Sequence, residues 1–279
     1  MSKLIDDLSP LRDVIREHHL RAEKKLGQNF LLDLNLTDKI TRAAGDLSGC
    51  TVFEIGPGPG GLTRSLLKSN AQKVIAIEYD ERAIAALQSL REAAAGRLEI
   101  IHGDALTQDL LSLAPAPRAI VANLPYNIAT PLLIGWLRQI REVPEAFRHL
   151  TLMFQKEVAQ RLTAPCSVSA YGRLSVISQW LCECQMMFDL PPSAFTPPPK
   201  VVSSVVHLIP RPLLPMGSPR FELVEKVTQA AFGQRRKMIR SSLKAYSPYI
   251  EKTGLDFQAR AEDLTVADFV QIASFLPQS

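Results

Sequence analysis

Five short apolar runs in the first part of the chain constrain the fold more than any other feature. Each run has six residues, and as a set they are rich in Ile and Val and contain no Pro. Such runs suit strands that are buried on both faces of a parallel sheet. Segments of helix length separate them, which is typical of a doubly wound α/β sheet. We therefore expect an α/β fold with strands at 51–56, 73–78, 98–103, 118–123 and 150–155, and a later strand at 203–210.

No strand pattern follows the Pro-rich stretch at 210–219. The segments 221–246 and 261–276 instead carry apolar residues at helical spacing, and Thr265 is placed to cap the last helix. These patterns predict a small all-helical C-terminal domain. We expect three parts: an N-terminal extension with a short lead helix at 1–25, an α/β domain at 26–212 and a helical domain at 213–279.

Charge is distributed unevenly along the 279 residues. The last 80 residues carry a net charge of +4, whereas residues 1–199 are neutral, and no acid lies between Lys226 and Lys244. This asymmetry indicates either a polyanionic partner for the C-terminal part or a solvated basic helix face.

The composition excludes several classes of protein. No run approaches the roughly 18 apolar residues that span a bilayer, and Asp6 and Asp7 stand where a signal peptide or presequence would be apolar or basic. The four Cys and five His lack metal-ligand spacing, which predicts free thiols in a reducing compartment and no metal site. Nothing indicates an obligate dimer, so we expect a cytoplasmic monomer.

A glycine-rich loop, Gly56–Gly61 (GPGPGG), joins the first predicted strand to the helix after it. Glycines at this turn let the backbone approach a ligand closely. Pro57 and Pro59 remove N–H donors that a pyrophosphate-binding loop would use. Glu54, before the loop, is placed to act on a cationic methionine ammonium group. These features favour S-adenosylmethionine over NAD as the cofactor.

Two further acids follow the next two predicted strands. Glu78 ends the second strand, 22 residues after Gly56, where a carboxylate accepts from ribose hydroxyls. Asp104 follows the third strand and is placed to accept from the adenine amine of the cofactor. Either acid alone can be a helix N-cap. Because three acids follow consecutive strands at the edge where such sheets bind ligands, we predict a cofactor site there.

The most specific motif is Asn123-Leu124-Pro125-Tyr126, directly after the fourth predicted strand. The 6-amino group of adenine is a poor nucleophile because its lone pair is delocalised into the ring. The Asn123 side-chain oxygen and the Leu124 carbonyl can accept its two hydrogens and favour a pyramidal nitrogen. Pro125 fixes the turn without a competing N–H, and Tyr126 offers a face for stacking a flipped base.

Five stretches occur in the same order as in one family. They are 28–31 (QNFL), 54–63 (EIGPGPGGLT), 123–133 (NLPYNIATPLL), 153–162 (MFQKEVAQRL) and 194–204 (AFTPPPKVVSS). The chain thereby resembles the small-subunit (16S-type) rRNA adenine N6,N6-dimethyltransferases, the kasugamycin-sensitivity family. That resemblance implies a Rossmann-like class I methyltransferase sheet, S-adenosylmethionine as cofactor, and dimethylation of two adjacent adenosines near the 3′ end of small-subunit rRNA in a nearly assembled particle.

The resemblance also implies roles for individual residues. The expected cofactor contacts come from the N-terminal segment, the strand ends and the acceptor motif. Phe195 would help hold the target base opposite Tyr126, and the other interpretation is an ordinary core residue. The expected contacts are Asn29, Leu31, Gly56, Glu78, Asp104 and Asn123 for the cofactor, and Arg235, Arg236, Lys237 and Arg240 for rRNA phosphates.

Three alternatives stay open. The first is a large-subunit rRNA adenine dimethyltransferase of the macrolide-resistance type, against which the segment at 195–201 and the basic run at 234–237 count. The second is a nucleic-acid-binding protein like the related mitochondrial transcription factors, against which the intact acceptor motif counts. The third is a DNA adenine methylase, which would need a domain that reads a duplex groove.

Overall fold

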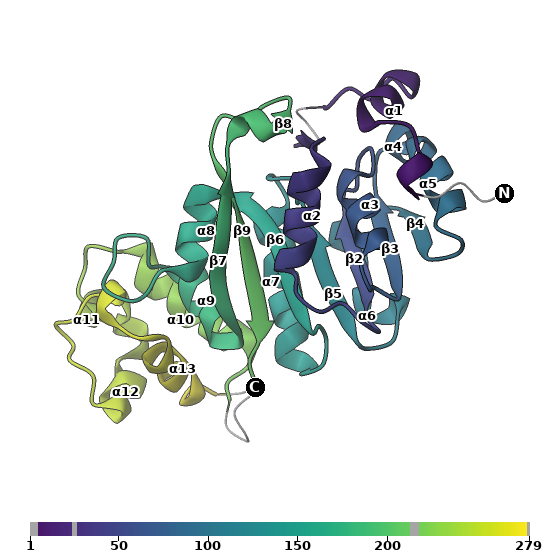
Figure 1. Ribbon diagram of the computed structural model, residues 1–279. Helices are drawn as coiled ribbons and strands as arrows, with labels where there is room; N and C mark the ends of the chain where they lie inside the picture. The colour runs from purple at the N-terminus through teal and green to yellow at the C-terminus, as the bar shows by residue number, and fades with distance from the viewer. Residues whose placement is uncertain (1–4, 24–26, 213–217, 278–279) are drawn as a thin grey trace. The chain divides into compact units, whose positions relative to one another are not determined.

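The computed structural model of the chain describes residues 5–23, 27–212 and 218–277 (Figure 1). The predicted domain boundary between residues 25 and 26 lies outside these ranges, as does the segment 213–217 of the Pro-rich stretch. Within the described part of the chain, no helix is long and apolar enough to cross a membrane.

A seven-stranded mixed sheet organises the fold, in the order β4-β3-β2-β5-β6-β9-β7 (Figure 1). Strands β2 to β6 pair in parallel, and β9 runs antiparallel to β6. All six predicted strands are confirmed, each to within one residue of its expected ends. The strands are β1 Phe30–Leu31, β2 Thr51–Ile55, β3 Lys73–Glu78, β4 Leu98–His102, β5 Arg118–Ala122, β6 His149–Gln155, β7 Cys182–Leu190, β8 Phe195–Thr196 and β9 Ser203–Pro210.

Three strands are absent from the sequence-based prediction. β7 lies at the edge of the sheet, and its residues alternate between exposed and less exposed and do not form a continuous apolar run. β1 and β8 have two residues each and pair with one another, Phe30 opposite Thr196 and Leu31 opposite Phe195. Strands of two residues are too short to produce a pattern.

Helices cover the sheet, and α2 and α3 pack side by side on one face of it (Figure 1). Ile40 from α2 and Leu66 from α3 are buried in one apolar cluster with Val52 and Val74 of the strands. The helices are α1 Leu11–Glu17, α2 Leu34–Ala43, α3 Gly61–Lys68, α4 Glu81–Ala86, α5 Gln88–Ala93, α6 Leu110–Leu113, α7 Ala129–Glu142, α8 Lys156–Thr163, α9 Arg173–Leu181, α10 Phe221–Gly233, α11 Ile239–Ser242, α12 Ser247–Ile250 and α13 Val266–Ser274.

The N-terminal extension packs against the sheet domain. Its predicted lead helix is α1, whose residue Val14 is buried with Phe30 and with Ala83 of α4. The guanidinium of Arg64, buried in α3, donates to the carbonyl of Ser9 at 2.8 Å. The described part of the extension therefore supports the same strands and helices that surround the glycine-rich loop.

The chain divides into two compact units. One unit consists of Met1–Trp136, Glu145–Lys156 and Met186–Leu208, and the other of Leu137–Pro144, Glu157–Gln185 and Ile209–Ser279. In the second unit α9 packs against α10 and α13. The domain boundary expected at residue 212 places α8 and α9 in the α/β domain, whereas residues 157–185 belong to the same compact unit as the C-terminal helices.

The last helix begins as expected from the sequence. The Thr265 side chain accepts from the Asp268 N–H at 3.2 Å, and the Asp268 carboxylate accepts from the Thr265 N–H at 2.7 Å. This reciprocal capping box satisfies two N–H groups at the start of α13.

A buried histidine makes the stability of the fold depend on pH. His149, in β6, is 6% exposed and lies 5.2 Å from the His207 ring, and burial chiefly lowers its pKa to about 4. Between the ordinary value near 6.5 and 4, the unfolded chain binds a proton that the folded protein excludes. We predict that lowering the pH through this interval reduces the free energy of unfolding by about 3 kcal/mol at this site.

Urea unfolding of the wild type and of His149→Phe at pH 7 and pH 5 measures this effect. The variant should lose less stability on acidification than the wild type. The exposed His102 provides a matched control, and His102→Phe should keep the wild-type pH dependence. An equal loss of stability in the wild type and His149→Phe would assign the acid sensitivity to other groups.

Candidate active site

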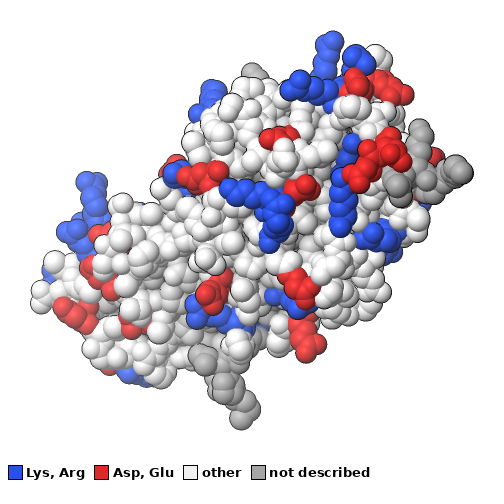
Figure 2. All heavy atoms as spheres, viewed as in Figure 1, with Lys and Arg blue, Asp and Glu red and all other residues white. Residues whose placement is uncertain are grey.

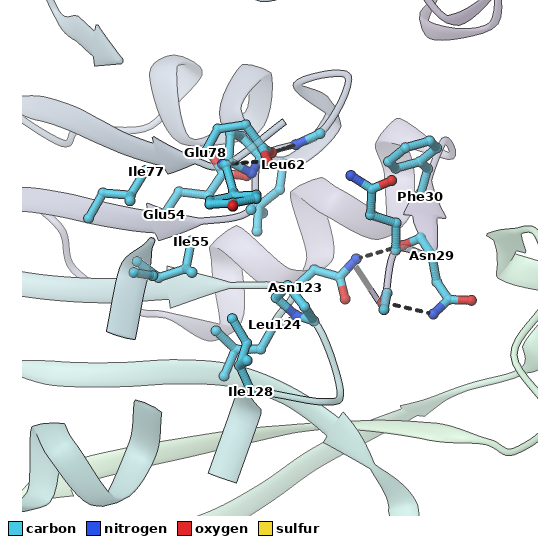
Figure 3. A pocket seen from close by; sticks show the side chains of 18 of the residues that line it. Asn29, Phe30, Glu54, Ile55, Leu62, Ile77, Glu78, Asn123, Leu124 and Ile128 are labelled. Atoms are coloured by element: carbon cyan, nitrogen blue, oxygen red, sulfur yellow. Dashed lines mark hydrogen bonds between the residues drawn. The ribbon is translucent and has the colours of Figure 1, made fainter. Parts of the chain in front are cut away.

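A cavity lies where the parallel strands β2, β3, β4 and β5 end (Figure 3). Because neighbouring parallel strands end at the same edge, residues far apart in sequence meet there. The segment before β1 contributes to the wall as well. Predicted site residues that line the cavity are Asn29, Leu31, Glu54, Gly56, Glu78, Asp104, Asn123, Leu124, Pro125 and Tyr126.

The N–H groups at the start of the glycine-rich loop donate to acceptors within the protein, so they are not available to a phosphate. The Gly56 N–H donates to the Ile77 carbonyl at 2.9 Å, and the Gly60 N–H donates to the Pro57 carbonyl at 3.0 Å. The Gly58 N–H donates to the Glu78 carboxylate at 3.1 Å. Since Pro57 and Pro59 have no N–H, this part of the loop has no donors left for a pyrophosphate, in agreement with the preference for S-adenosylmethionine.

Gly58 also shows why a glycine is required at the cavity wall. Its φ is +55°, and a Cβ there would lie 3.0 Å from the Phe30 ring. A larger residue would therefore be strained and would push Phe30, which lines the same cavity.

Glu78 is held firmly at the end of β3. It is 5% exposed, and its carboxylate accepts from the N–H groups of Gly58, Tyr79 and Asp80 at 2.8–3.1 Å. Burial raises its pKa, although these three donors lower it in part. The carboxylate is thus fixed in position at the wall of the cavity.

Glu54 is a buried acid, and its charged form would need a cation or a hydrogen-bond donor nearby. It is 2% exposed, and its Oε2 has no hydrogen-bond partner among the described residues. Burial is the main cause that raises its pKa to about 8, and the neighbouring Glu78 charge adds to the effect. A cationic group in the cavity would compensate this carboxylate, and the methionine ammonium of S-adenosylmethionine is such a group.

Asp104 lines the cavity and also caps a short helix. Its Oδ1 accepts from the Leu106 N–H at 2.9 Å, and the side chain is exposed. Two exposed apolar residues beside the carboxyl ends of β3 and β4, Tyr79 at 62% and Leu106 at 48%, line the same cavity. Neither residue is among those predicted from the sequence, although Tyr79 directly follows Glu78 and Leu106 lies two residues after Asp104.

The acceptor motif is oriented by the segment before β1. Nδ2 of Asn123 donates to the carbonyl of Asn29 at 3.1 Å, which leaves Oδ1 available to accept (Figure 3). Leu124 is 1% exposed, and Pro125 lies close to where a Cβ on Gly56 would be. The Asn29 side chain itself donates to the Gly27 carbonyl at 3.3 Å.

Tyr126 and Phe195, which we expect to hold the target base between them, have different surroundings. Tyr126 lines the cavity, and its hydroxyl shares a 2.5 Å hydrogen bond with that of Ser203. Phe195 is 3% exposed, belongs to the apolar core cluster around α2 and α3, and is not among the residues that line the cavity. This placement favours the core role for Phe195, and its contact with the target base stays a prediction.

The predicted RNA-binding residues also differ among themselves. Arg235 donates to the carbonyls of Ser169 and Tyr171 and to the Glu262 carboxylate, so its guanidinium is used within the helical unit. Arg236, Lys237 and Arg240 are exposed and form no ion pair with other described residues. On the face seen in Figure 2, basic and acidic side chains are interspersed, without one continuous basic patch.

Comparison with known proteins identifies the family of the chain. Residues 19–278 match the family model described as ribosomal RNA adenine dimethylase. The chain is 57% identical over 273 residues to "Ribosomal RNA small subunit methyltransferase A" of Paramagnetospirillum magneticum, covering 97% of this chain and 95% of that protein. It is 56% identical over 276 residues to the protein of the same name from Allorhizobium ampelinum, covering 98% and 99%.

Two solved structures share the fold. A dimethyladenosine transferase from Plasmodium falciparum matches with a TM-score of 0.70 and 28% identity, covering 86% of this chain and 94% of that one. The 23S rRNA methyltransferase ErmE matches with a TM-score of 0.66 and 27% identity, covering 88% and 98%. The sheet is thus a class I methyltransferase sheet, and the chain belongs to the ribosomal RNA adenine dimethylase family.

Proposed function

We propose that this chain transfers methyl groups from S-adenosylmethionine to the 6-amino groups of two adjacent adenosines in a loop near the 3′ end of small-subunit rRNA. The observation that carries the proposal is the Asn123 amide, oriented by the Asn29 carbonyl beside a cavity suited to the cofactor. The 57% identity to a protein named for the small subunit supports that subunit over the large one. The product is a pair of dimethyladenosines.

The cofactor supplies an electrophilic methyl group on a sulfonium. Glu78 would accept from the ribose hydroxyls, and Asp104 from the adenine amine. Tyr79 and Leu106, whose apolar surfaces are exposed at the cavity, would bracket the adenine ring. Glu54 would balance the methionine ammonium group. Asn29 and Leu31 would close the cavity from the side of β1.

The acceptor site needs no general base. Oδ1 of Asn123 and the Leu124 carbonyl would accept the two hydrogens of the target amine and stabilise positive charge as it develops on nitrogen. Once methylated, the ammonium is acidic enough to lose its proton to water. Tyr126 would stack on the flipped base and hold the nitrogen in line with the methyl group.

The helical domain would bind rRNA. Arg236, Lys237 and Arg240 are the residues that we expect to contact phosphates, because they are exposed and not engaged in ion pairs with described residues. Arg235 would serve mainly to hold the helical unit together. We infer that the enzyme acts as a monomer in the cytoplasm on a small-subunit precursor late in its assembly.

Replacement of Asn123 tests the acceptor mechanism. We predict that Asn123→Ala lowers methyl transfer at least about 100-fold, because one of two preset acceptors is lost. Binding of S-adenosylhomocysteine should fall far less than methyl transfer, because the other cofactor contacts remain, and the thermal unfolding midpoint should stay close to wild type. Asn35→Ala, at an exposed asparagine of α2, is the matched control with normal turnover. Near-normal methyl transfer by Asn123→Ala would rule out the acceptor pair.

Proton release tests the role of Glu54. With a pKa of about 8, its carboxyl group is mostly protonated at pH 7, and a bound ammonium group should deprotonate it. We predict that binding of S-adenosylhomocysteine at pH 7 releases up to about one proton, and that Glu54→Gln releases less. Calorimetry in two buffers of different ionisation enthalpy measures this. Equal release by the two proteins would place the ammonium elsewhere.

Salt dependence tests the RNA-binding residues. We predict that replacing Arg236, Lys237 and Arg240 with Ser weakens binding to unmethylated small subunits. The slope of log K against log salt should become shallower by about 0.7 for each phosphate that the variant no longer neutralises. The control removes three exposed arginines of the other unit, Arg12, Arg42 and Arg91. A change of slope in the control alone would move the RNA interface away from the helical domain.

A further inference from the structure

We propose that Ser203 is a positioning residue for methyl transfer, because its hydroxyl anchors the Tyr126 ring against which the target base stacks. This inference rests on the proposed function and adds a residue to it. Tyr126 needs a fixed tilt, since a base that stacks on a moving ring presents its amine at a varying angle to the methyl group.

The contact between the two side chains is direct. The hydroxyl oxygens of Tyr126 and Ser203 lie 2.5 Å apart, and Ser203 is fully buried. Burial of the Tyr126 side chain raises the pKa of its phenol, so the ring keeps its proton at neutral pH. The tyrosine hydroxyl is therefore occupied by the anchor, which leaves the face of the ring for the base.

Ser203 is the more rigid partner of this pair. It is the first residue of β9 and lies opposite Gln155 in the antiparallel ladder with β6. On either side of it the backbone is held as well. The Lys156 N–H donates to the carbonyl of Val202 at 2.9 Å, and Ser204 lies opposite Phe154 in the same ladder. Tyr126, by contrast, lies in the loop between β5 and α7.

The same bond relates two motifs that are 77 residues apart. Tyr126 completes the acceptor motif, and Ser203 follows the exposed Pro-rich loop at 196–202. A shift of that loop can change the position of the Tyr126 ring through Ser203, although the loop itself does not line the cofactor cavity. We therefore expect loss of the bond to affect turnover and leave cofactor binding unchanged.

The test measures initial rates of methyl transfer to small subunits that lack the modification. Ser203→Ala and Tyr126→Phe should each lower kcat about tenfold, with the KM for S-adenosylmethionine unchanged. The kcat of the double variant should also be about tenfold below that of the wild type and no lower, because both changes remove one shared bond. Ser203→Thr, which keeps the hydroxyl, should restore most of the rate.

Ser204 supplies a matched control. It is the neighbouring buried serine, but its hydroxyl binds Asp189. Ser204→Ala should shift the thermal unfolding midpoint as much as Ser203→Ala does and keep the wild-type kcat. Wild-type kcat in Ser203→Ala, or rate losses that multiply in the double variant, would overturn the proposal. Failure of the wild type to methylate small subunits would instead overturn the proposed function.

Discussion

The parallel pairing of β2, β3, β4 and β5 is the constraint on which the site depends. In this register each strand ends at the same edge, so Glu54, Glu78 and Asn123 reach one cavity although they are distant in sequence. The N–H groups of Gly56, Gly58 and Gly60 in the glycine-rich loop have partners within the fold. As a result, the cavity offers carboxylates and apolar surface to a cationic cofactor and few donors to a phosphate.

The two units differ in the charges that they carry. The sheet unit holds buried acids, and burial raises the pKa of Glu54 to about 8, so a bound cation is expected to release its proton. The helical unit carries exposed cations that suit phosphates. Charge in the sequence alone indicates this division. Arg235 shows where that indication fails, because a cation inside a basic run can donate to groups of its own unit.

The sheet was predictable from sequence because buried parallel strands are continuous apolar runs. The cofactor loop was predictable because a cluster of glycines between a strand and a helix is typical of a turn that approaches a ligand closely. The strand β7 was not, since its residues alternate between exposed and less exposed and form no continuous apolar run. The role of Ser203 was also hidden. A serine at the start of a strand has no distinctive pattern, and only the folded chain brings it to Tyr126. Phe195 illustrates the converse, because a motif residue can be buried in the core.

The most direct test of the account is the position of the methyl groups that the enzyme adds. Small subunits without the modification, mature small subunits, naked rRNA and large subunits should each be incubated with the protein and labelled S-adenosylmethionine. Mass spectrometry of the rRNA then locates the product. We predict dimethyladenosine at two adjacent positions near the 3′ end of small-subunit rRNA, and only in particles that lacked it. Methylation of large subunits, or no transfer to any RNA, would contradict it.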